Sequence, residues 1–429
     1  MKDEVKVALL GCGTVGTQVA RLLGEQAEDF AARSGARLRL IGIAVRDASA
    51  PRDPAIDPAL LTEDADSIID QADIVIELIG GIEPARTYIL RAFQAGASVV
   101  TGNKALLAEH GPELYEAAAE ANVDLYYEAA VAGAIPVVYG LRESLAGDRI
   151  TQILGIVNGT TNYILDEMTV AGLSFDEALK QAQELGFAEA DPTADVDGLD
   201  AAAKCAILAS LAFHTRVELS DVEVTGIREI TAADIASATA AGYVIKLLAN
   251  AKRHEDGIEV SVAPTLVPAD HPLATVHGSF NAVVIEAEAA DRLMFYGRGA
   301  GGAPTASAVL SDVVAAASHK VLGGNAPREL IYGDVPILPA SKTRARHQLE
   351  LVVVDQIGVL TEVTGVFARH GVSISAVAQS YGRGKKSDTC HLTVTTHEAQ
   401  QNELDATLAD LRESSFVTDI VRVIRVEEN

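Results

Sequence analysis

Cysteine is scarce in this chain, and the three that occur, Cys12, Cys205 and Cys390, lie far apart. Scattered thiols provide neither the short spacing of a structural zinc site nor a disulfide framework. Apolar runs are also short: none is long enough to cross a bilayer, and the run before Gly11 is too short for a signal peptide. We therefore expect a protein of the reducing cytoplasm without a membrane partner.

Positive charge is in deficit as well. The chain has 34 Lys and Arg against 60 Asp and Glu, which gives a formal net charge of -26. Such an excess of negative charge repels polyanions, so it argues against nucleic acid as a partner. Hydrophobic residues, in contrast, make up 48% of the 429 residues. This length and composition predict a large core divided among two or three domains.

The stretch GFAEADPTADVDGLDAAAK, residues 186–204, combines carboxylates with a lysine. Asp200 and Lys204 lie one turn apart on a helix predicted over residues 199–213. An ammonium group held among carboxylates is a candidate proton shuttle. The alternative is a capped helix with an ordinary i,i+4 pair worth about 0.3–0.5 kcal/mol. The stretch by itself leaves both readings open. Its other carboxylates are Glu189, Asp191, Asp195 and Asp197.

A glycine-rich turn follows the apolar run at residues 5–10 and precedes a helix predicted over residues 17–28. In the motif GCGTVG, Gly11 permits a tight turn, Gly13 lets the backbone approach a pyrophosphate, and Gly16 lets the helix pack close to the strand. The helix start supplies amides to the phosphates. Strand, motif and helix together predict a dinucleotide site.

The end of the second predicted strand, residues 38–45, bears on the choice of cofactor. It runs into Arg46 and Asp47. An arginine here can pair with the 2'-phosphate of NADP, whereas a carboxylate binds the ribose 2'-hydroxyl of NAD. Arg46 favours NADP, and Asp47 leaves NAD open.

Further strands are predicted over residues 74–79, 98–101 and 124–130, with helices between them. This alternation is typical of a Rossmann-type doubly wound parallel sheet in an α/β protein. Ligands of such sheets bind beyond the carboxyl ends of the strands. Lys104 and Glu128 follow or end two of these strands, so we expect both to face the cofactor crevice.

Beyond residue 136 strands occur without regular crossover helices, which predicts an α+β domain with a mainly antiparallel sheet. The expected strands cover residues 150–158, 222–227, 257–265 and 282–289. The polar turn at residues 158–162 either caps a helix or contacts substrate. A second glycine-rich turn, residues 297–302, precedes a helix that we expect to return to the nucleotide-binding domain.

The tail has the order βαββαβ of a ferredoxin-like unit. We expect a nucleotide-binding domain at residues 1–135 with a return helix at about 303–322, and a catalytic and dimerisation domain at 136–302. A proline-containing linker at 327–346 then leads to the ferredoxin-like domain at 347–429.

Six motifs, in order, make the chain resemble the homoserine dehydrogenase family over almost its whole length. They are GCGTVG (11–16), GNKALLA (102–108), EAAVAGAIP (128–136), NGTTNYIL (158–165), LGFAEADPTADVDGLDAAAK (185–204) and GRGAGGAPTASAV (297–309). The segment VDQIGVLTEVTGVFARHGVSI (354–374) is similar to an ACT domain, an amino-acid-sensing module.

The resemblance implies reversible NAD(P)-dependent interconversion of L-homoserine and L-aspartate 4-semialdehyde. By the same resemblance Lys204 is the proton donor to the semialdehyde oxygen, and Lys104 lies near the nicotinamide and the substrate. Threonine is the implied effector, and a homodimer or homotetramer the implied assembly. The remaining implied site residues are Glu189, Asp195, Asp200 and Thr160 for the substrate, Thr14, Val15, Gly186 and Gly301 for the cofactor, and Glu128 with the carbonyls of Val131, Gly133 and Ile135 for a sodium ion.

Three alternatives remain at this stage. The chain could be a non-catalytic sensor of amino acid and cofactor, or a related dehydrogenase that acts on another amino acid. The tail could be an oligomerisation unit that binds nothing. Aspartate-semialdehyde dehydrogenase, which needs a thiol nucleophile, does not fit the positions of the cysteines.

Overall fold

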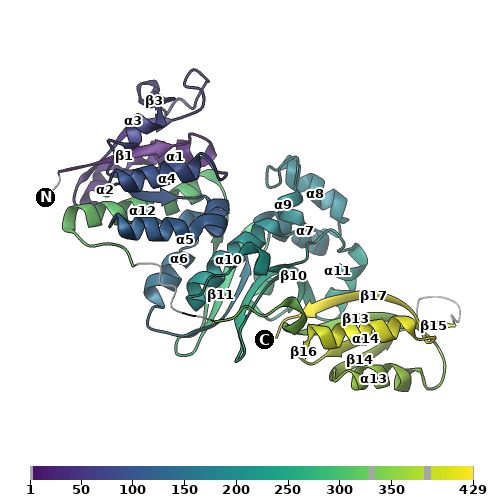
Figure 1. The fold of residues 1–429 in the computed structure, drawn as a ribbon. Coiled ribbons are helices and arrows are strands. Elements are labelled where there is room, and N and C mark those ends of the chain that lie inside the picture. Colours follow the sequence, from purple (N-terminus) through teal and green to yellow (C-terminus); the bar gives the residue numbers. More distant parts are fainter. Residues whose placement is uncertain (1–2, 328–332, 334, 381–387, 429) are drawn as a thin grey trace.

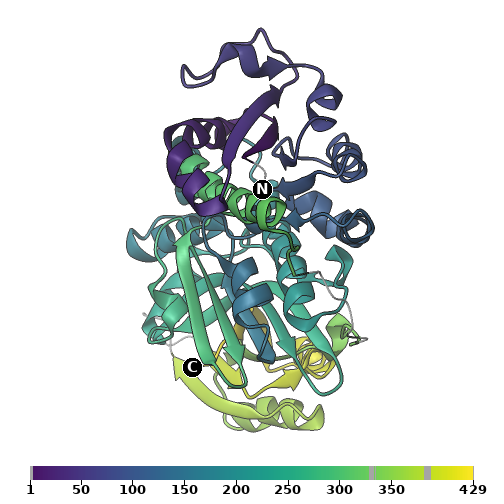
Figure 2. The same ribbon diagram turned by 90° about the vertical axis from the view of Figure 1, so that its left-hand side faces the viewer.

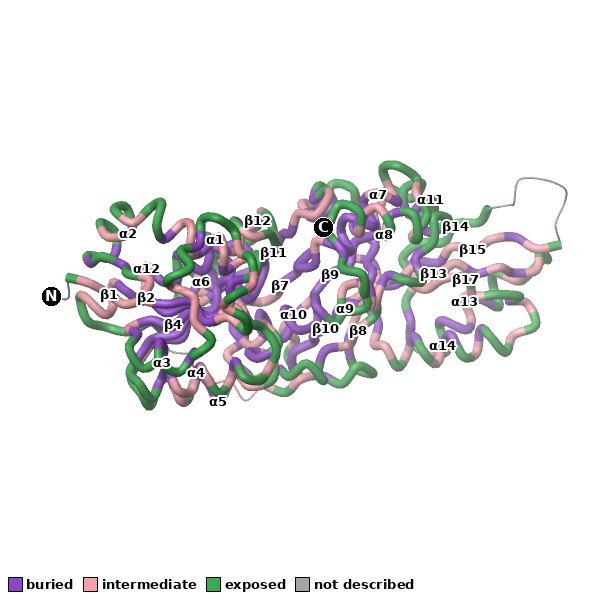
Figure 3. The backbone as a smooth tube through the Cα atoms, turned by 90° about the horizontal axis from the view of Figure 1, so that it is seen from above, coloured by how far each residue is buried: buried purple, intermediate pink, exposed green. Residues whose placement is uncertain are grey.

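The computed structural model describes residues 3–327, 333, 335–380 and 388–428. Figure 1 shows an N-terminal domain in purple and blue, a central domain in teal, and a C-terminal domain in yellow and light green. The domains follow one another in a row, and buried backbone runs through the interior of the row in Figure 3. Within the described residues, none of the helices has both the length and the apolar character needed to cross a membrane.

The N-terminal domain is built on a parallel sheet with the strand order β3-β2-β1-β4-β5-β6. Alternate residues of β1 enter different cores: Val7 and Leu9 pack on one face, Ala8 and Leu10 on the other. Burial on both faces explains the continuous apolar run and confirms the predicted doubly wound sheet. The strands are β1 (Glu4–Leu10), β2 (Arg37–Ala44), β3 (Leu61–Thr62), β4 (Ile74–Glu77), β5 (Ser98–Thr101) and β6 (Leu125–Tyr126).

Helices cover both faces of this sheet. Helix α12 (Gly302–Leu322) comes from beyond the central domain and packs against α1 and α2, as Figure 2 shows. Its buried alanines and valines complete the core on that face. The other helices of the domain are α1 (Thr14–Glu25), α2 (Ala27–Ser34), α3 (Ala65–Ile69), α4 (Ala85–Gln94) and α5 (Lys104–Glu120), with a 3-10 turn at Pro58–Leu60.

The central domain has a mainly antiparallel sheet, as predicted. Its long hairpin, β9 (Tyr243–Arg253) and β10 (Ile258–Pro268), pairs along its full length. Neither β9 nor the strand at Asp291–Arg298 was predicted. The other strands are β7 (Ile150–Ile156), β8 (Glu223–Val224), β11 (Phe280–Ala287) and β12 (Asp291–Arg298). The helices are α6 (Val137–Tyr139), α7 (Gly159–Val170), α8 (Phe175–Glu184), α9 (Thr193–Val196), α10 (Leu199–Phe213) and α11 (Ala232–Ala240), with short helical turns at Gly140–Ser144, Leu219–Asp221 and Pro272–Thr275.

Helix α10 is buried on nearly every side. Its sequence, LDAAAKCAILASLAF, is rich in alanine, and small side chains let it lie close to β9 and β10. Asp200 and Lys204 are therefore buried together in an apolar helix. Because buried charges need partners, this position favours the functional reading of the pair over a solvent-exposed one.

The C-terminal domain has the predicted βαββαβ order. Its strand order is β17-β13-β15-β14, and β17 pairs in parallel with β10 at Thr265 and Leu266. The central and C-terminal sheets thus form a continuous sheet. The elements are β13 (Arg344–Val354), α13 (Val359–Arg369), β14 (Ile374–Ser380), β15 (Thr389–Thr396), β16 (Ala399–Gln400), α14 (Gln401–Glu413) and β17 (Val417–Val426), preceded by a 3-10 turn at Ala340–Lys342.

Several local predictions were wrong. The strand expected over residues 222–227 is only the two-residue β8. The strand expected over residues 124–130 ends at Tyr126, and a 3-10 turn at Glu128–Ala130 carries the chain inward. Strand β13 begins at Arg344, inside the segment predicted as a linker, because residues 344 and 345 pair with β16. In the C-terminal domain the sequence predicts strands over residues 373–381 and 387–396; the ends of these predictions at residues 381 and 387 lie outside the described residues.

Candidate active site

A cavity of about 1010 Å³ lies between the N-terminal and central domains. Lys104, at the first turn of α5, enters it from the nucleotide-binding side, whereas Asp200 and Lys204 enter it from α10. The cavity brings together many of the residues predicted from the motifs. Also in its lining are Thr160, Gly186, Glu189, Asp195 and Gly301.

Asp200 connects two lysines. Lys204 Nζ donates to Asp200 Oδ2 at 2.7 Å and to the Val157 carbonyl at 2.8 Å. The other Asp200 oxygen forms an ion pair with Lys104, which belongs to the opposite domain. Burial alone would raise the pKa of Asp200, but the two ammonium groups outweigh it and hold that pKa well below its usual value. The carboxyl therefore stays ionised and orients both lysines.

Asn158 was not predicted as an individual site residue. It caps α7 by accepting from the Thr161 amide at 2.9 Å, so the capping alternative for this turn is confirmed. Its Nδ2 also donates to Asp195 at 2.7 Å and to Asp200 at 2.9 Å. One amide thus orders two carboxylates of the acidic stretch. The capping pattern marked this position in the sequence, but its two carboxylate partners lie in α9 and in the first turn of α10, 37 and 42 residues further along the chain.

The acidic loop is held in place by Thr160. Its hydroxyl donates to the Phe187 carbonyl at 2.7 Å, which anchors the segment that carries Glu189. Asp191 accepts from the Thr193 amide at 3.1 Å, and Asp197 pairs with Arg228 on the exposed side of α9. Asp191 and Asp197 thus have structural partners. Glu189, Asp191 and Asp195 line the cavity, and Asp197 lies outside it.

The first glycine turn fits a dinucleotide. A Cβ on Gly11, whose φ is +100°, would lie 2.7 Å from the Leu78 carbonyl oxygen, and one on Gly16 would lie 2.2 Å from that of Gly11. Both positions therefore require glycine. At Gly13 no heavy atom comes within 4 Å of the Cβ position, which leaves room for a phosphate at the start of α1. Because α1 begins at Thr14, three residues earlier than predicted, Thr14 and Val15 lie in its first turn.

The second glycine turn adjoins the first. Gly301, with φ of +120°, caps α12, and a Cβ on Gly302 would lie 3.0 Å from the Thr14 carbonyl oxygen. The starts of α1 and α12 are therefore close neighbours. Since Gly301 also lines the large cavity, the space at the phosphate turn borders the space beside Lys204.

Two arginines lie beyond β2. Arg46 is exposed and lies two residues after the end of β2, one residue further from the strand than predicted. Arg52, which sequence reasoning missed, donates to the carbonyls of Cys12 at 3.2 Å and Asp47 at 3.1 Å, and so spans the phosphate turn and the end of β2. The Asp47 carboxylate accepts from the Ser49 amide and hydroxyl, and these bonds lower its pKa. Arg52 lies in a loop that returns to the phosphate turn, so no periodic pattern in the sequence marks it.

Glu128 faces the interior rather than the cofactor crevice, contrary to the prediction. Its carboxylate accepts from the amides of Val138 at 2.9 Å and Tyr139 at 2.8 Å, at the start of α6. Burial raises the pKa of Glu128 to about 7. Gly133, with φ of +58°, packs so closely that a Cβ would lie 2.4 Å from the Gly299 carbonyl oxygen. Within the described residues no group of three His, Cys, Asp or Glu side chains could hold a metal ion, so a cation here depends on backbone carbonyls.

Comparison with known proteins agrees with this geometry. Residues 136–314 match the family model for homoserine dehydrogenase, residues 11–128 match its NAD-binding domain, and residues 347–415 match the ACT domain. The chain is 53% identical to the homoserine dehydrogenase of Corynebacterium glutamicum over 100% of this chain and 96% of that protein.

Solved structures are similar as well. The homoserine dehydrogenase of Thiobacillus denitrificans superposes with a TM-score of 0.91 at 38% identity, covering 99% of this chain and 98% of that one. A hyperthermophilic archaeal homoserine dehydrogenase in complex with NADPH superposes with a TM-score of 0.63 at 28% identity, covering 76% of this chain and 100% of that one.

Proposed function

Since this chain belongs to the homoserine dehydrogenase family, we propose that it reversibly reduces L-aspartate 4-semialdehyde to L-homoserine with a nicotinamide cofactor. The observation that carries the proposal is the buried Lys204–Asp200 pair in a cavity that borders a dinucleotide turn. A bound nicotinamide supplies or accepts the hydride. The protein's part is to hold the substrate and to move the proton.

Lys204 is the proton donor in reduction and the acceptor in oxidation. Its ammonium group is held by Asp200 and the Val157 carbonyl, which leaves its third N–H free to point at the substrate oxygen. Lys104 places a second ammonium group across the cleft and stabilises negative charge on that oxygen. Glu189 and Asp195 bind the substrate ammonium, and Thr160 contributes by fixing the loop that carries Glu189.

For the cofactor we propose a preference for NADP. Arg46 and Arg52 supply positive charge beside the end of β2. The Asp47 carboxylate, in contrast, already accepts hydrogen bonds from the amide and hydroxyl of Ser49. Two guanidinium groups suit a 2'-phosphate. The phosphates themselves would lie at Gly13 and the first turn of α1.

We further propose that the carbonyls of Val131, Gly133 and Ile135 hold a sodium ion and that Glu128 adds negative charge to this site. Support comes from the irregular backbone at Gly133 and from the suitability of oxygen donors for hard cations. Its role would be structural. The assembly would be a homodimer or homotetramer, since β12 and β14 form sheet edges and β12 exposes Met294 and Tyr296.

The decisive experiment is a steady-state assay with homoserine and either NADP or NAD, in the presence and absence of threonine. We expect homoserine-dependent formation of NADPH. A chain that binds cofactor but oxidises neither homoserine nor related amino alcohols would instead be a sensor. Turnover with a different amino acid substrate would identify a related dehydrogenase. Inhibition by threonine would support a regulatory role for the ACT domain.

A further inference from the structure

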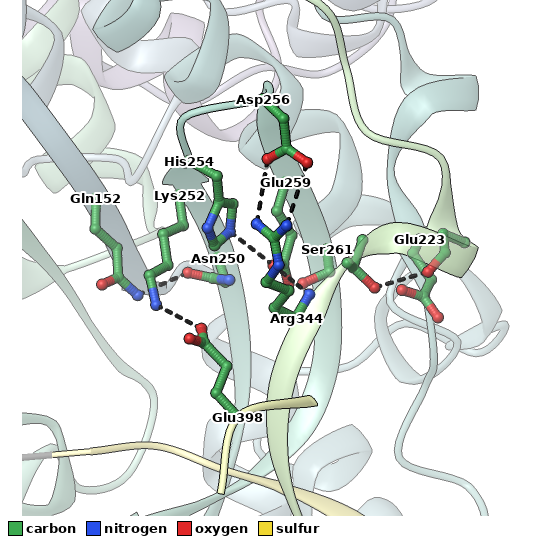
Figure 4. A network of polar contacts seen from close by, with 12 residues as sticks. Gln152, Glu223, Asn250, Lys252, His254, Asp256, Glu259, Ser261, Arg344 and Glu398 are labelled. Carbon is green, nitrogen blue, oxygen red and sulfur yellow. Dashed lines mark hydrogen bonds and ion pairs between the residues drawn. The ribbon is translucent and has the colours of Figure 1, made fainter. Parts of the chain in front are cut away.

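A lysine is buried on the face of the central sheet that points away from α10. Lys246 of β9 is only 3% exposed, and by the alternation of the strand it shares this face with Leu248, whereas Leu247 between them packs on the side of α10. Lys252 lies further along the same face, but it is partly exposed and pairs with Glu398 at 3.1 Å, as Figure 4 shows. Burial thus distinguishes Lys246 from Lys252.

Lys246 has hydrogen-bond partners but no counter-ion. Its Nζ donates to Asn162 Oδ1 at 3.0 Å and to the Val276 carbonyl at 2.7 Å. Among the described residues it forms no ion pair. Burial lowers the pKa of Lys246 to about 8, and the charge of Asp166 opposes this effect only in part. Because an apolar residue would avoid the cost of taking a cation out of water, the lysine calls for a role beyond stability of the fold.

The two partners of Lys246 are themselves connected. Asn162, on α7, donates through Nδ2 to three carbonyls of the loop at residues 276–280, those of Val276 at 3.2 Å, Gly278 at 2.8 Å and Phe280 at 3.2 Å. Asp166, one turn further along α7, accepts from the Gly278 amide at 2.7 Å. Since Lys246 holds the side-chain oxygen of Asn162, the nitrogen of that amide faces the loop. The lysine therefore determines how Asn162 is oriented.

The loop at residues 276–280 borders the active-site cavity. Ser279 lines that cavity together with Gly159 and Thr160 at the start of α7. The loop and the helix meet so closely that a Cβ on Gly159 would lie 2.6 Å from the Ser279 carbonyl oxygen. A displacement of the loop would therefore reach the start of α7, where Thr160 anchors the segment that carries Glu189.

We propose that Lys246 is a positioning residue for the substrate. Through Asn162 and the Val276 carbonyl it fixes residues 276–280 against α7, and it thereby keeps Thr160 in the geometry that substrate binding requires. Lys246 does not itself line the cavity, so it acts on the affinity for the substrate rather than on proton transfer. This kinetic consequence rests on the proposed function, whereas the fixing of the loop does not.

The kinetic test compares Lys246→Met with Lys252→Met, a matched control on the same face of β9 that loses only the pair with Glu398. In Lys246→Met we expect the KM for homoserine to rise about tenfold, as for a lost hydrogen bond from a charged group, and the KM for NADP to change little. In Lys252→Met both KM values should stay at those of the wild type.

Hydrogen–deuterium exchange of the full chain measures the loop independently of activity. Exchange over residues 276–280 and in the first turn of α7 should be faster in Lys246→Met and unchanged in Lys252→Met. Asn162→Ala should act in the same way, and its combination with Lys246→Met should raise the KM no further than the stronger single change, because the lysine acts through this amide. If Lys246→Met does not fold, Lys246→Gln, which keeps a donor on a shorter side chain, takes its place.

Three results would overturn the proposal: unchanged exchange of residues 276–280 in Lys246→Met, additive effects of Lys246→Met and Asn162→Ala, or a lower Tm with an unchanged KM for homoserine, which would indicate a purely structural lysine. A wild-type chain that does not oxidise homoserine would refute the proposed function, and the exchange would still decide whether Lys246 fixes the loop. An active wild type with an unchanged KM in Lys246→Met would refute the positioning role alone.

Discussion

Asp200 and Lys104 form an ion pair across the cleft between two domains, while the second oxygen of Asp200 lies 2.7 Å from Lys204 Nζ. The pair ties the nucleotide-binding domain to the catalytic helix, so the position of the proton donor depends on how the domains meet. Because Asp200 contacts both lysines, its role extends beyond that of an acidic residue in the first turn of α10.

Replacement of Lys204 by alanine should lower kcat by about 10²–10⁴-fold, because positioned proton transfer contributes about that much. Binding of the cofactor, followed by NADPH fluorescence, should change little, since the phosphate turn lies elsewhere. Lys180→Ala, on the exposed surface of α8, is the matched control. Undiminished turnover in Lys204→Ala would remove this lysine from the mechanism.

Asn158→Ala should lower kcat by roughly 10–100-fold, because hydrogen bonds to charged groups are worth about 1.5–3 kcal/mol. The variant also loses the cap of α7, at about 1 kcal/mol of stability. Asn158→Ser separates the effects: serine can cap the helix but is too short to hold both Asp195 and Asp200. We expect stability to recover in Asn158→Ser and turnover to stay low. Recovery of both would mean that Asn158 acts through the cap alone.

Arg46→Ala and Arg52→Ala should each raise the KM for NADP by about 10–100-fold, the cost of a lost charged contact, with a much smaller change for NAD. Arg52→Ala should also weaken both cofactors somewhat, because Arg52 holds the Cys12 carbonyl of the phosphate turn. Arg39→Ala, at an exposed position within β2, is the control. Equal effects on the two cofactors would argue against a 2'-phosphate site.

The free energy of unfolding should decrease as the pH is lowered, because His347 is buried in its neutral form. Burial lowers its pKa to about 4, so between the unfolded value of about 6.5 and this folded value the unfolded chain binds more protons. Stability is thus complete above about pH 6.5 and lost progressively toward pH 4. From pH 7 to pH 5 the loss is about 2 kcal/mol. Urea unfolding of His347→Gln should show a smaller pH dependence than that of His397→Gln, an exposed histidine. Identical slopes would contradict the assignment.

Truncation after Ser341 should abolish any regulation by the C-terminal domain, and it should also destabilise the central one. It removes β17 from the edge of β10 and takes Arg425 away from the buried Glu259. Removing one partner of a buried ion pair costs about 3–5 kcal/mol. His254, at 3.2 Å from the Glu259 carboxylate, remains beside it and keeps the loss toward the lower end of that range. Differential scanning calorimetry should therefore show a lower Tm for the remaining domains, which Glu259→Gln partly restores. A truncated chain of unchanged Tm would show that the domains are independent.

Much of the fold could be predicted from local sterics and from the periodicity of hydrophobic residues. The glycine turn follows from spacing, because Gly11 and Gly16 have no room for a side chain. The alanine-rich helix with Asp200 and Lys204 one turn apart was also predicted, but the stretch alone left open whether the two form an ordinary pair or a functional one, and only the structure shows that both are buried. The order of strands and helices determined the parallel sheet and the βαββαβ tail.

Tertiary structure decided the features that join distant segments. Pairing of β10 with β17 depends on residues about 160 positions apart, and nothing in either strand specifies its partner. Arg52 reaches the phosphate turn through a loop, and Glu128 turns inward because the amides of α6 lie there. The motifs of the chain therefore indicated the chemistry of Lys204 and Asp200, and only packing placed Lys104 opposite them.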